Sequence, residues 1–164
     1  MKWWTCSTKA AISTTVPGSI AIDAGATTAH QGAQIQRLKA GFVPAANKSI
    51  WAEFTVRTSA LTIETFVGLA ASDTTIIASG AMNVNNHMGW SSTTGDGVLI
   101  FDNDKAGTGS LTTGPTMVAA TSIKLGFFYD GSADTLQQYV NGVATGTAVA
   151  RRPSSGTAAC AARP

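Results

Sequence analysis

The chain has 164 residues, which is enough for one domain with a real hydrophobic core. Only 12% of its residues are charged, about half the usual quarter, and its many Gly, Ser, Thr and Ala residues are typical of an all-β protein rich in turns. No apolar run approaches the roughly 18 residues of a membrane-spanning helix, so we expect no membrane partner. The net charge is only +2, and the chain between its two ends has no basic patch interleaved with aromatic residues, so we expect no nucleic-acid partner.

The first residues are predicted to form an N-terminal arm over residues 1–19. Their opening, "MKWWTCSTKAAISTT", has an apolar run that breaks at once into polar residues, which argues against a secretory signal peptide. Cys6 and Cys160 lie near opposite ends of the chain. The two cysteines could form a disulfide, or they could be free thiols in a reducing compartment; we prefer the free thiols.

Strand patterns run from residue 20 to residue 149. The clearest is "IWAEFTVRT", in which Ile50 and alternate residues after it face the core, while Trp51 and Glu53 point to solvent. Further strands are predicted at 33–38, in "IETFVGLAAS", in "HMGWSS", in "GVLIFDN", at 123–129 and at 136–140. The "TTGDG" turn makes a hairpin of "HMGWSS" and "GVLIFDN", and Asn141-Gly142 has the residues of a type I′ turn before "VATGTAV".

About eight strands with this spacing predict an all-β fold, an antiparallel two-sheet β-sandwich or jelly roll over residues 20–149. The strands of Trp51 and Leu125 are expected in its interior. The alternation ends after Val149, so residues 150–164 are predicted to be a C-terminal tail.

Few residues offer catalytic chemistry. The chain has no Gly-x-Ser-x-Gly elbow, phosphate loop or dinucleotide fingerprint. Glycoside hydrolysis, the natural enzymatic use of such a sandwich, needs two carboxyl groups across the sugar. The only glutamates, Glu53 and Glu64, lie on different predicted strands, and neither has an acid two residues away. We expect both to be solvated, and we expect no enzyme activity.

Asp102, Asn103 and Asp104 are consecutive oxygen donors of the kind that calcium binds. Polar residues at the end of a strand more often form a turn in which their side chains bond to the backbone, so we expect no metal ion and no cofactor there. His30 and His87 are isolated in the sequence, and we expect both to be structural residues.

Trp51 and Trp90 are the candidates for a sugar-binding platform, because exposed aromatic rings on a sandwich can stack against sugars. The alternative is that these residues cap the core or are buried in a subunit interface, where Trp is favoured.

Four stretches, in this order, resemble one known family: "IWAEFTVRTS", "FVGLAASDTTIIASGA", "GVLIFDNDKAGTG" and "IKLGFFYDGSADTLQQYVNGV". Together with "GATTAHQGAQIQ", they are similar to the concanavalin-like (laminin-G-like) jelly-roll domains, above all to those of small virion proteins of tailed bacteriophages. The resemblance covers residues 25–149. It implies a two-sheet jelly roll and a non-enzymatic structural protein of the virion, made in the host cytoplasm. Such a protein would decorate or cement the capsid exterior by binding the lattice of the major capsid protein.

Both ends of the chain depart from the family's pattern, and we expect them to act as arms that become ordered on binding. The apolar anchors would be Trp3 and Trp4, and the polar anchors would be Arg151 and Arg152, because arginine grips carboxylates bidentately. We also expect a homo-oligomer. The alternative function is a carbohydrate-binding (lectin-like) module on a phage tail or a secreted protein. A glycoside hydrolase is the third hypothesis, against which the scarcity of acids argues.

Overall fold

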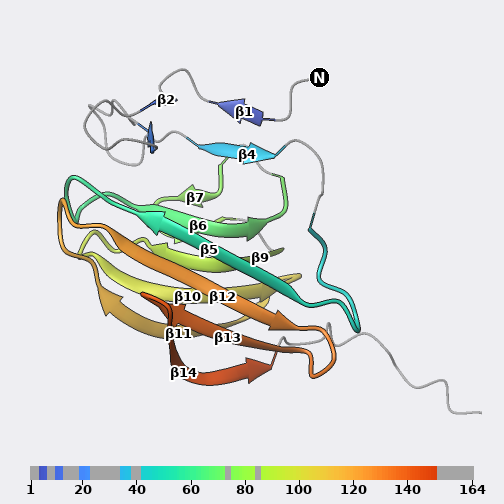
Figure 1. Cartoon of the computed structure of the whole chain (residues 1–164). Helices are drawn as coiled ribbons and strands as arrows, with labels where there is room; N and C mark the ends of the chain where they lie inside the picture. The colour runs from blue at the N-terminus through green and yellow to red at the C-terminus, as the bar shows by residue number, and fades with distance from the viewer. Residues whose placement is uncertain are drawn as a thin grey trace, which may run out of the picture.

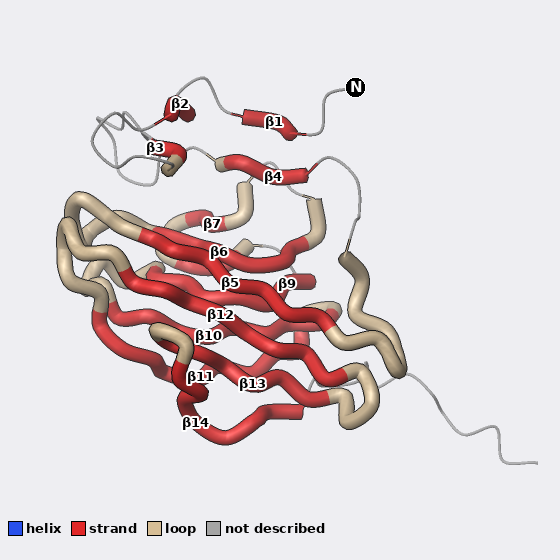
Figure 2. Tube along the Cα trace, in the orientation of Figure 1, coloured by secondary structure: helices blue, strands red, loops and turns tan. Residues whose placement is uncertain are grey.

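Two four-stranded antiparallel sheets make up most of the fold (Figure 1). The computed structural model describes residues 4–6, 10–12, 19–22, 34–37, 42–72, 75–83 and 86–150. Within these ranges the chain forms strands, turns and loops and no helix, as the tube in Figure 2 makes plain. The predicted all-β class and the antiparallel two-sheet β-sandwich are confirmed.

Both sheets are built in the same way, from a meander of three consecutive strands and one earlier strand. The first, here called the β12 sheet, has the order β14-β13-β12-β5. Its strands are β5 (Ile50–Val56), β12 (Ile123–Asp130), β13 (Thr135–Val140) and β14 (Val143–Ala150). The second, the β10 sheet, has the order β11-β10-β9-β6. Its strands are β6 (Thr65–Ala70), β9 (Asn86–Ser92), β10 (Val98–Lys105) and β11 (Thr108–Thr116).

The prediction that the Trp51 strand lies inside its sheet was wrong. β5 pairs with β12 on one side, with Ile50 opposite Tyr129 and Val56 opposite Ile123, and has no neighbour on its other side among the described strands. β12, which holds Leu125, is flanked by β5 and β13 and is interior as predicted. The period-two pattern of β5 was read correctly, but an edge strand with one buried face has the same pattern as an interior strand.

The hydrophobic core lies between the sheets and follows the alternation of their strands. In β12, Leu125, Phe127 and Tyr129 are each at most 1% exposed. The ring of Phe127 lies 5.7 Å from that of Phe101 in β10, so the two sheets meet through aromatic contacts. The buried apolar cluster comprises Met88, Trp90, Leu99, Phe101, Met117, Leu125, Phe127, Tyr129 and Leu136.

The predicted hairpins are present. β9 and β10 pair through the loop at residues 93–97, and β13 and β14 are joined by Asn141-Gly142, whose φ angles of 51° and 81° are those of a type I′ turn. A second turn of this kind, Ala106-Gly107, joins β10 to β11. These tight turns fix the register of both meanders.

The remaining strands are short. They are β1 (Trp4–Cys6), β2 (Ala10–Ile12), β3 (Ile20–Ile22), β4 (Ile35–Arg37), β7 (Ile77–Ala78) and β8 (Ala81–Met82). They pair as β1-β4, β2-β3 and β7-β8. The segment predicted as an N-terminal arm therefore includes two short strands, and the predicted strand at 33–38 is present as β4.

Candidate functional site

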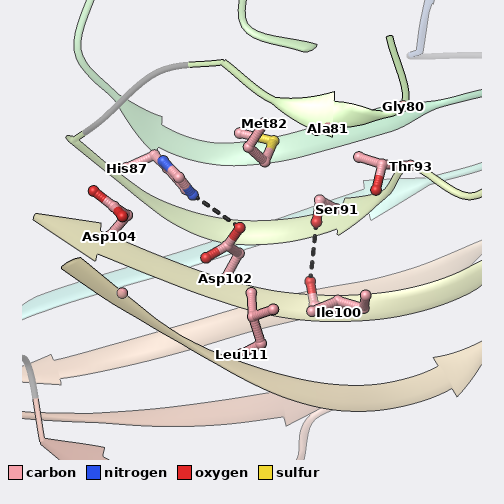
Figure 3. Close-up of a pocket in the computed structure, with 11 residues that line it drawn as sticks. Gly80, Ala81, Met82, His87, Ser91, Thr93, Ile100, Asp102, Asp104 and Leu111 are labelled. Carbon is pink, nitrogen blue, oxygen red and sulfur yellow. Dashed lines mark hydrogen bonds and ion pairs between the residues drawn. The ribbon is translucent and has the colours of Figure 1, made fainter. Parts of the chain in front are cut away.

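A cavity of about 410 Å³ lies on the outer face of the β10 sheet, beneath the β7-β8 hairpin (Figure 3). It is lined by Gly80, Ala81, Met82, His87, Ser91, Thr93, Ile100, Asp102, Asp104, Gly109 and Leu111. We call this group the outer pocket. Its polar groups come from β9, from β10 and from Thr93 just after β9, whereas Met82 and Leu111 supply apolar walls from β8 and β11.

Alternation along β10 explains why its acids reach the outer pocket. Leu99 and Phe101 are buried in the core, so Ile100, Asp102 and Asp104 project from the opposite face. The antiparallel register then places Asp104 opposite His87 of β9. The register thereby brings His87 to the acids of β10, which lie 15 or more positions later in the chain, in the outer pocket.

His87 and Asp102 form the polar centre of the outer pocket. The Nε2 atom of His87 lies 3.1 Å from Oδ2 of Asp102, and Figure 3 shows the imidazole directed at the carboxylate of the neighbouring strand. Their side chains are only 4% and 14% exposed. A buried imidazole and a nearly buried carboxylate stabilise each other against the cost of losing water. The expectation that His87 has a structural role agrees with this pairing, but its partner was not foreseen.

A pair of glycines makes room for an aromatic ring beside this centre. Gly68 and Gly89 face each other across β6 and β9. A Cβ atom at Gly89 would lie 2.4 Å from the carbonyl oxygen of Val67 and 3.0 Å from the Phe66 ring. The absence of side chains at both positions lets the Phe66 ring meet His87 edge-on, at 6.0 Å between ring centres.

The prediction of a turn at Asp102–Asp104 was wrong, because these residues continue β10. Each is paired with β9 on one side and β11 on the other, and the turn comes two residues later at Ala106-Gly107. Asp104 does bond to that turn, since its Oδ1 accepts the Gly107 N–H at 2.9 Å. Asn103 points into the sandwich and is 3% exposed. The three oxygen donors therefore do not converge, and the described residues hold no cluster of three metal-binding side chains.

Asp102 and Asp104 are two acids on one strand face: they are two residues apart in β10 and project into the same pocket. The prediction that no such pair exists considered only the glutamates. Glu53 lies instead on the outer face of the β12 sheet, where it pairs with Lys124 at 3.2 Å. Glu64 precedes β6 and is partly exposed.

Ser91 lies in the outer pocket with His87 and Asp102, but the three do not form a nucleophile–base–acid relay. Ser91 and His87 are four residues apart on β9, which is about 13 Å along a strand. The Ser91 hydroxyl donates to the carbonyl oxygen of Ile100 at 3.5 Å. The His87 imidazole directs its Nε2 atom at Asp102.

Trp51 points to solvent from β5, as predicted, and is 51% exposed. Its ring meets Tyr139 at 4.7 Å and Phe128 at 6.5 Å between centres. Tyr139 lies opposite Gly126 rather than opposite Trp51, so the two rings meet diagonally across a position that has no side chain. Trp51, Phe128 and Tyr139 form what we call the outer aromatic cluster, on the opposite side of the molecule from the outer pocket.

Trp90 cannot belong to an exposed platform, and the prediction that it is a sugar-binding candidate is corrected. It is 1% exposed and packs edge-on against Phe101 at 5.4 Å. Its indole N–H donates to the carbonyl oxygen of Gly126 at 3.0 Å. In β9, core-facing positions alternate with pocket-facing ones, and Trp90 falls on the core side, two residues beyond Met88.

Of the predicted anchors, Trp3, Arg151 and Arg152 lie outside the described residues, and Trp4 lies in β1. His30 and Cys160 also lie outside the described residues, whereas Cys6 ends β1. The described part of the chain contains no helix long and apolar enough to span a membrane. Comparison with known protein families, curated proteins and solved structures finds no match for this chain.

Proposed function

We propose that this protein is a non-enzymatic structural protein of a virion, with a concanavalin-like jelly-roll fold, which decorates the capsid exterior by binding the major capsid protein. The observation that carries the proposal is the outer aromatic cluster. Trp51 presents half of its surface to solvent at the edge of a sheet that carries few charges. Trp and Tyr are the residues that most often dominate the energy of protein interfaces.

A binding test separates this cluster from the rest of the surface. Purified protein is sedimented with empty shells of the major capsid protein, and Trp51→Ala is compared with Val118→Ala, which truncates a residue that is 64% exposed in a loop. Loss of an interface hot spot of about 2 kcal/mol weakens binding by about 30-fold. We expect that loss for Trp51→Ala and none for Val118→Ala. Unbound wild-type protein, or equal binding by both variants, would contradict the proposal.

The second candidate function, carbohydrate binding, is favoured by the outer pocket. Its carboxylates and hydroxyls match the alternating donors and acceptors of a sugar, and its apolar walls match the C–H face of the ring. Isothermal titration against a panel of oligosaccharides tests it. Asp104→Ala should abolish any binding at this pocket, whereas Glu53→Gln, on the other sheet, should leave it unchanged.

The non-enzymatic part of the proposal has its own test. Asp102 and Asp104 share a strand face, but one is engaged by His87 and the other by the turn at Gly107. Incubation of the protein with β-glucans and other polysaccharides should yield no product. Hydrolysis that disappears in Asp102→Asn or in Glu53→Gln would make the protein an enzyme.

A further inference from the structure

β11 is an edge strand without a single charged residue. Its sequence is "TGSLTTGPT", and among the described strands it pairs only with β10. Soluble proteins usually protect such edges with charges, with proline or with bulges, because an open edge pairs with other strands. β14, on the same side of the sandwich, is protected by a bulge and by a bend at Gly146, whose φ is 66°. β11 has a bulge after Thr113 and a proline, Pro115, near its end, so the straight and neutral part of this edge is Thr108–Thr113.

The turn before β11 shows which of its backbone groups face outwards. In a two-residue hairpin the closing pair, here Lys105 and Thr108, exchanges hydrogen bonds. Alternation then directs the N–H and C=O groups of Gly109, Leu111 and Thr113 away from β10. Within the described part of the chain, these groups have no hydrogen-bond partner. They are a row of strong donors and acceptors to which another strand is the matching ligand.

The middle residue of this row is also an exposed apolar side chain. Leu111 is 68% exposed and lies at the rim of the outer pocket. If a second β11 runs antiparallel with Leu111 opposite itself, Gly109 lies opposite Thr113 of the partner and all three residues exchange hydrogen bonds. Paired residues of this kind lie about 5.5 Å apart, with side chains on the same face. The two leucines then cover each other.

We propose that two copies of this chain pair through β11, so that their β10 sheets join as one eight-stranded antiparallel sheet. A second copy is the occupant we infer, because the edge is complementary to itself about a two-fold axis. Its lack of charge means that two identical edges approach without repulsion. The partner's Leu111 then lies beside Leu111 at the pocket rim, so each outer pocket is completed by a residue of the other copy.

Sedimentation equilibrium of the full chain tests this pairing without any capsid. We expect a particle of twice 16.8 kDa. Leu111→Lys places two like charges side by side on the axis and should weaken dimerisation at least tenfold, whereas Val118→Lys, a matched change of an exposed residue, should leave the dimer intact. A monomeric wild type, or a Leu111→Lys variant that dimerises as tightly, would overturn the proposal.

Hydrogen exchange of the wild-type protein gives a second readout that needs no variant. The amides of Gly109, Leu111 and Thr113 should be protected in concentrated solution and lose that protection on dilution. The amides of Ser110 and Thr112, which face β10, should stay protected throughout. Fast exchange of the outward amides in a dimer would place the interface elsewhere. Protection that requires capsid shells would assign the edge to the capsid protein and overturn self-pairing, while leaving the proposed function standing.

Discussion

Trp51 and Trp90 show how far a single residue's role depends on its strand position. Both occur in clear strand patterns, but one is half-exposed and the other is buried with its indole N–H bonded to Gly126. Trp90→Phe removes that donor and leaves both a cavity and an unpaired carbonyl, so it should lower the free energy of unfolding by about 2–4 kcal/mol. Trp51→Phe should change it by less than about 1 kcal/mol. Urea denaturation followed by circular dichroism measures both, and equal effects would contradict the placement of Trp90.

The fold alters the titration of Asp96 in a definite direction. In the β9-β10 loop its Oδ1 accepts the Thr94 hydroxyl at 2.7 Å and the Val98 N–H at 2.9 Å. These bonds, that of Thr94 first, hold the pKa of Asp96 below its ordinary value of 3.8. The stability they give is present above pH 3.8 and is lost as the pH falls through the folded-state pKa.

Thr94→Val should therefore raise the pKa of Asp96 towards 3.8. Thr93→Val, its neighbour, should leave that pKa unchanged, because Thr93 makes no bond to the carboxylate. Carboxyl carbon chemical shifts recorded against pH measure both variants. An identical titration in Thr94→Val and the wild type would show that the hydroxyl is not the main cause.

At the scale of the elements, the turn at Asn141-Gly142 holds β13 and β14 in register with each other and with β12. Besides its left-handed φ, Asn141 accepts the Lys124 N–H on its side-chain oxygen at 3.0 Å and donates its own N–H to Lys124 at 2.8 Å. Asn141→Ala strains the backbone and removes the side-chain bond, and should cost about 1–3 kcal/mol. Asn141→Gly removes only the side-chain bond and should cost less. Thermal unfolding compares the two, and a costlier glycine variant would contradict this account.

What the sequence could predict at this scale follows from how local the interactions are. The hairpins β9-β10 and β13-β14 depend on nearby turn residues, and both were predicted. The partners of β5 and β6 are not the next strands along the chain, and no local pattern identifies them. β10 runs through Asp102 and Asp104 because strands pair on both of its sides, and this tertiary pairing outweighs the preference of those residues for turns. His87 and Asp102 meet only through that register, so their pairing could not be predicted from the sequence.

At the scale of the whole molecule, the ends of the chain can be separated from the sandwich. Trp4 lies in β1, outside the two main sheets, and Trp3, Arg151 and Arg152 lie outside the described residues. Deleting residues 1–15 and 151–164 should leave the circular dichroism spectrum of an all-β protein unchanged while weakening attachment to capsid shells. Alanine at the four positions in the full chain should reproduce the weakening. Decoration as tight as that of the full chain would mean that docking depends on the sandwich alone.

The pairing of β5 with β12 has a consequence for how the protein is made. Their residues are 67 to 79 positions apart, whereas β6 and β9 are separated by only 17 to 27. During translation at about 5–20 residues per second, β5 leaves the ribosome on the order of 3–16 s before its partner exists. The β10 sheet can assemble in that interval, and the β12 sheet then closes over it. A stop between residues 117 and 122 would release a chain that has every strand of the β10 sheet but no β12 to cover its apolar face, which is a substrate for chaperones and proteases.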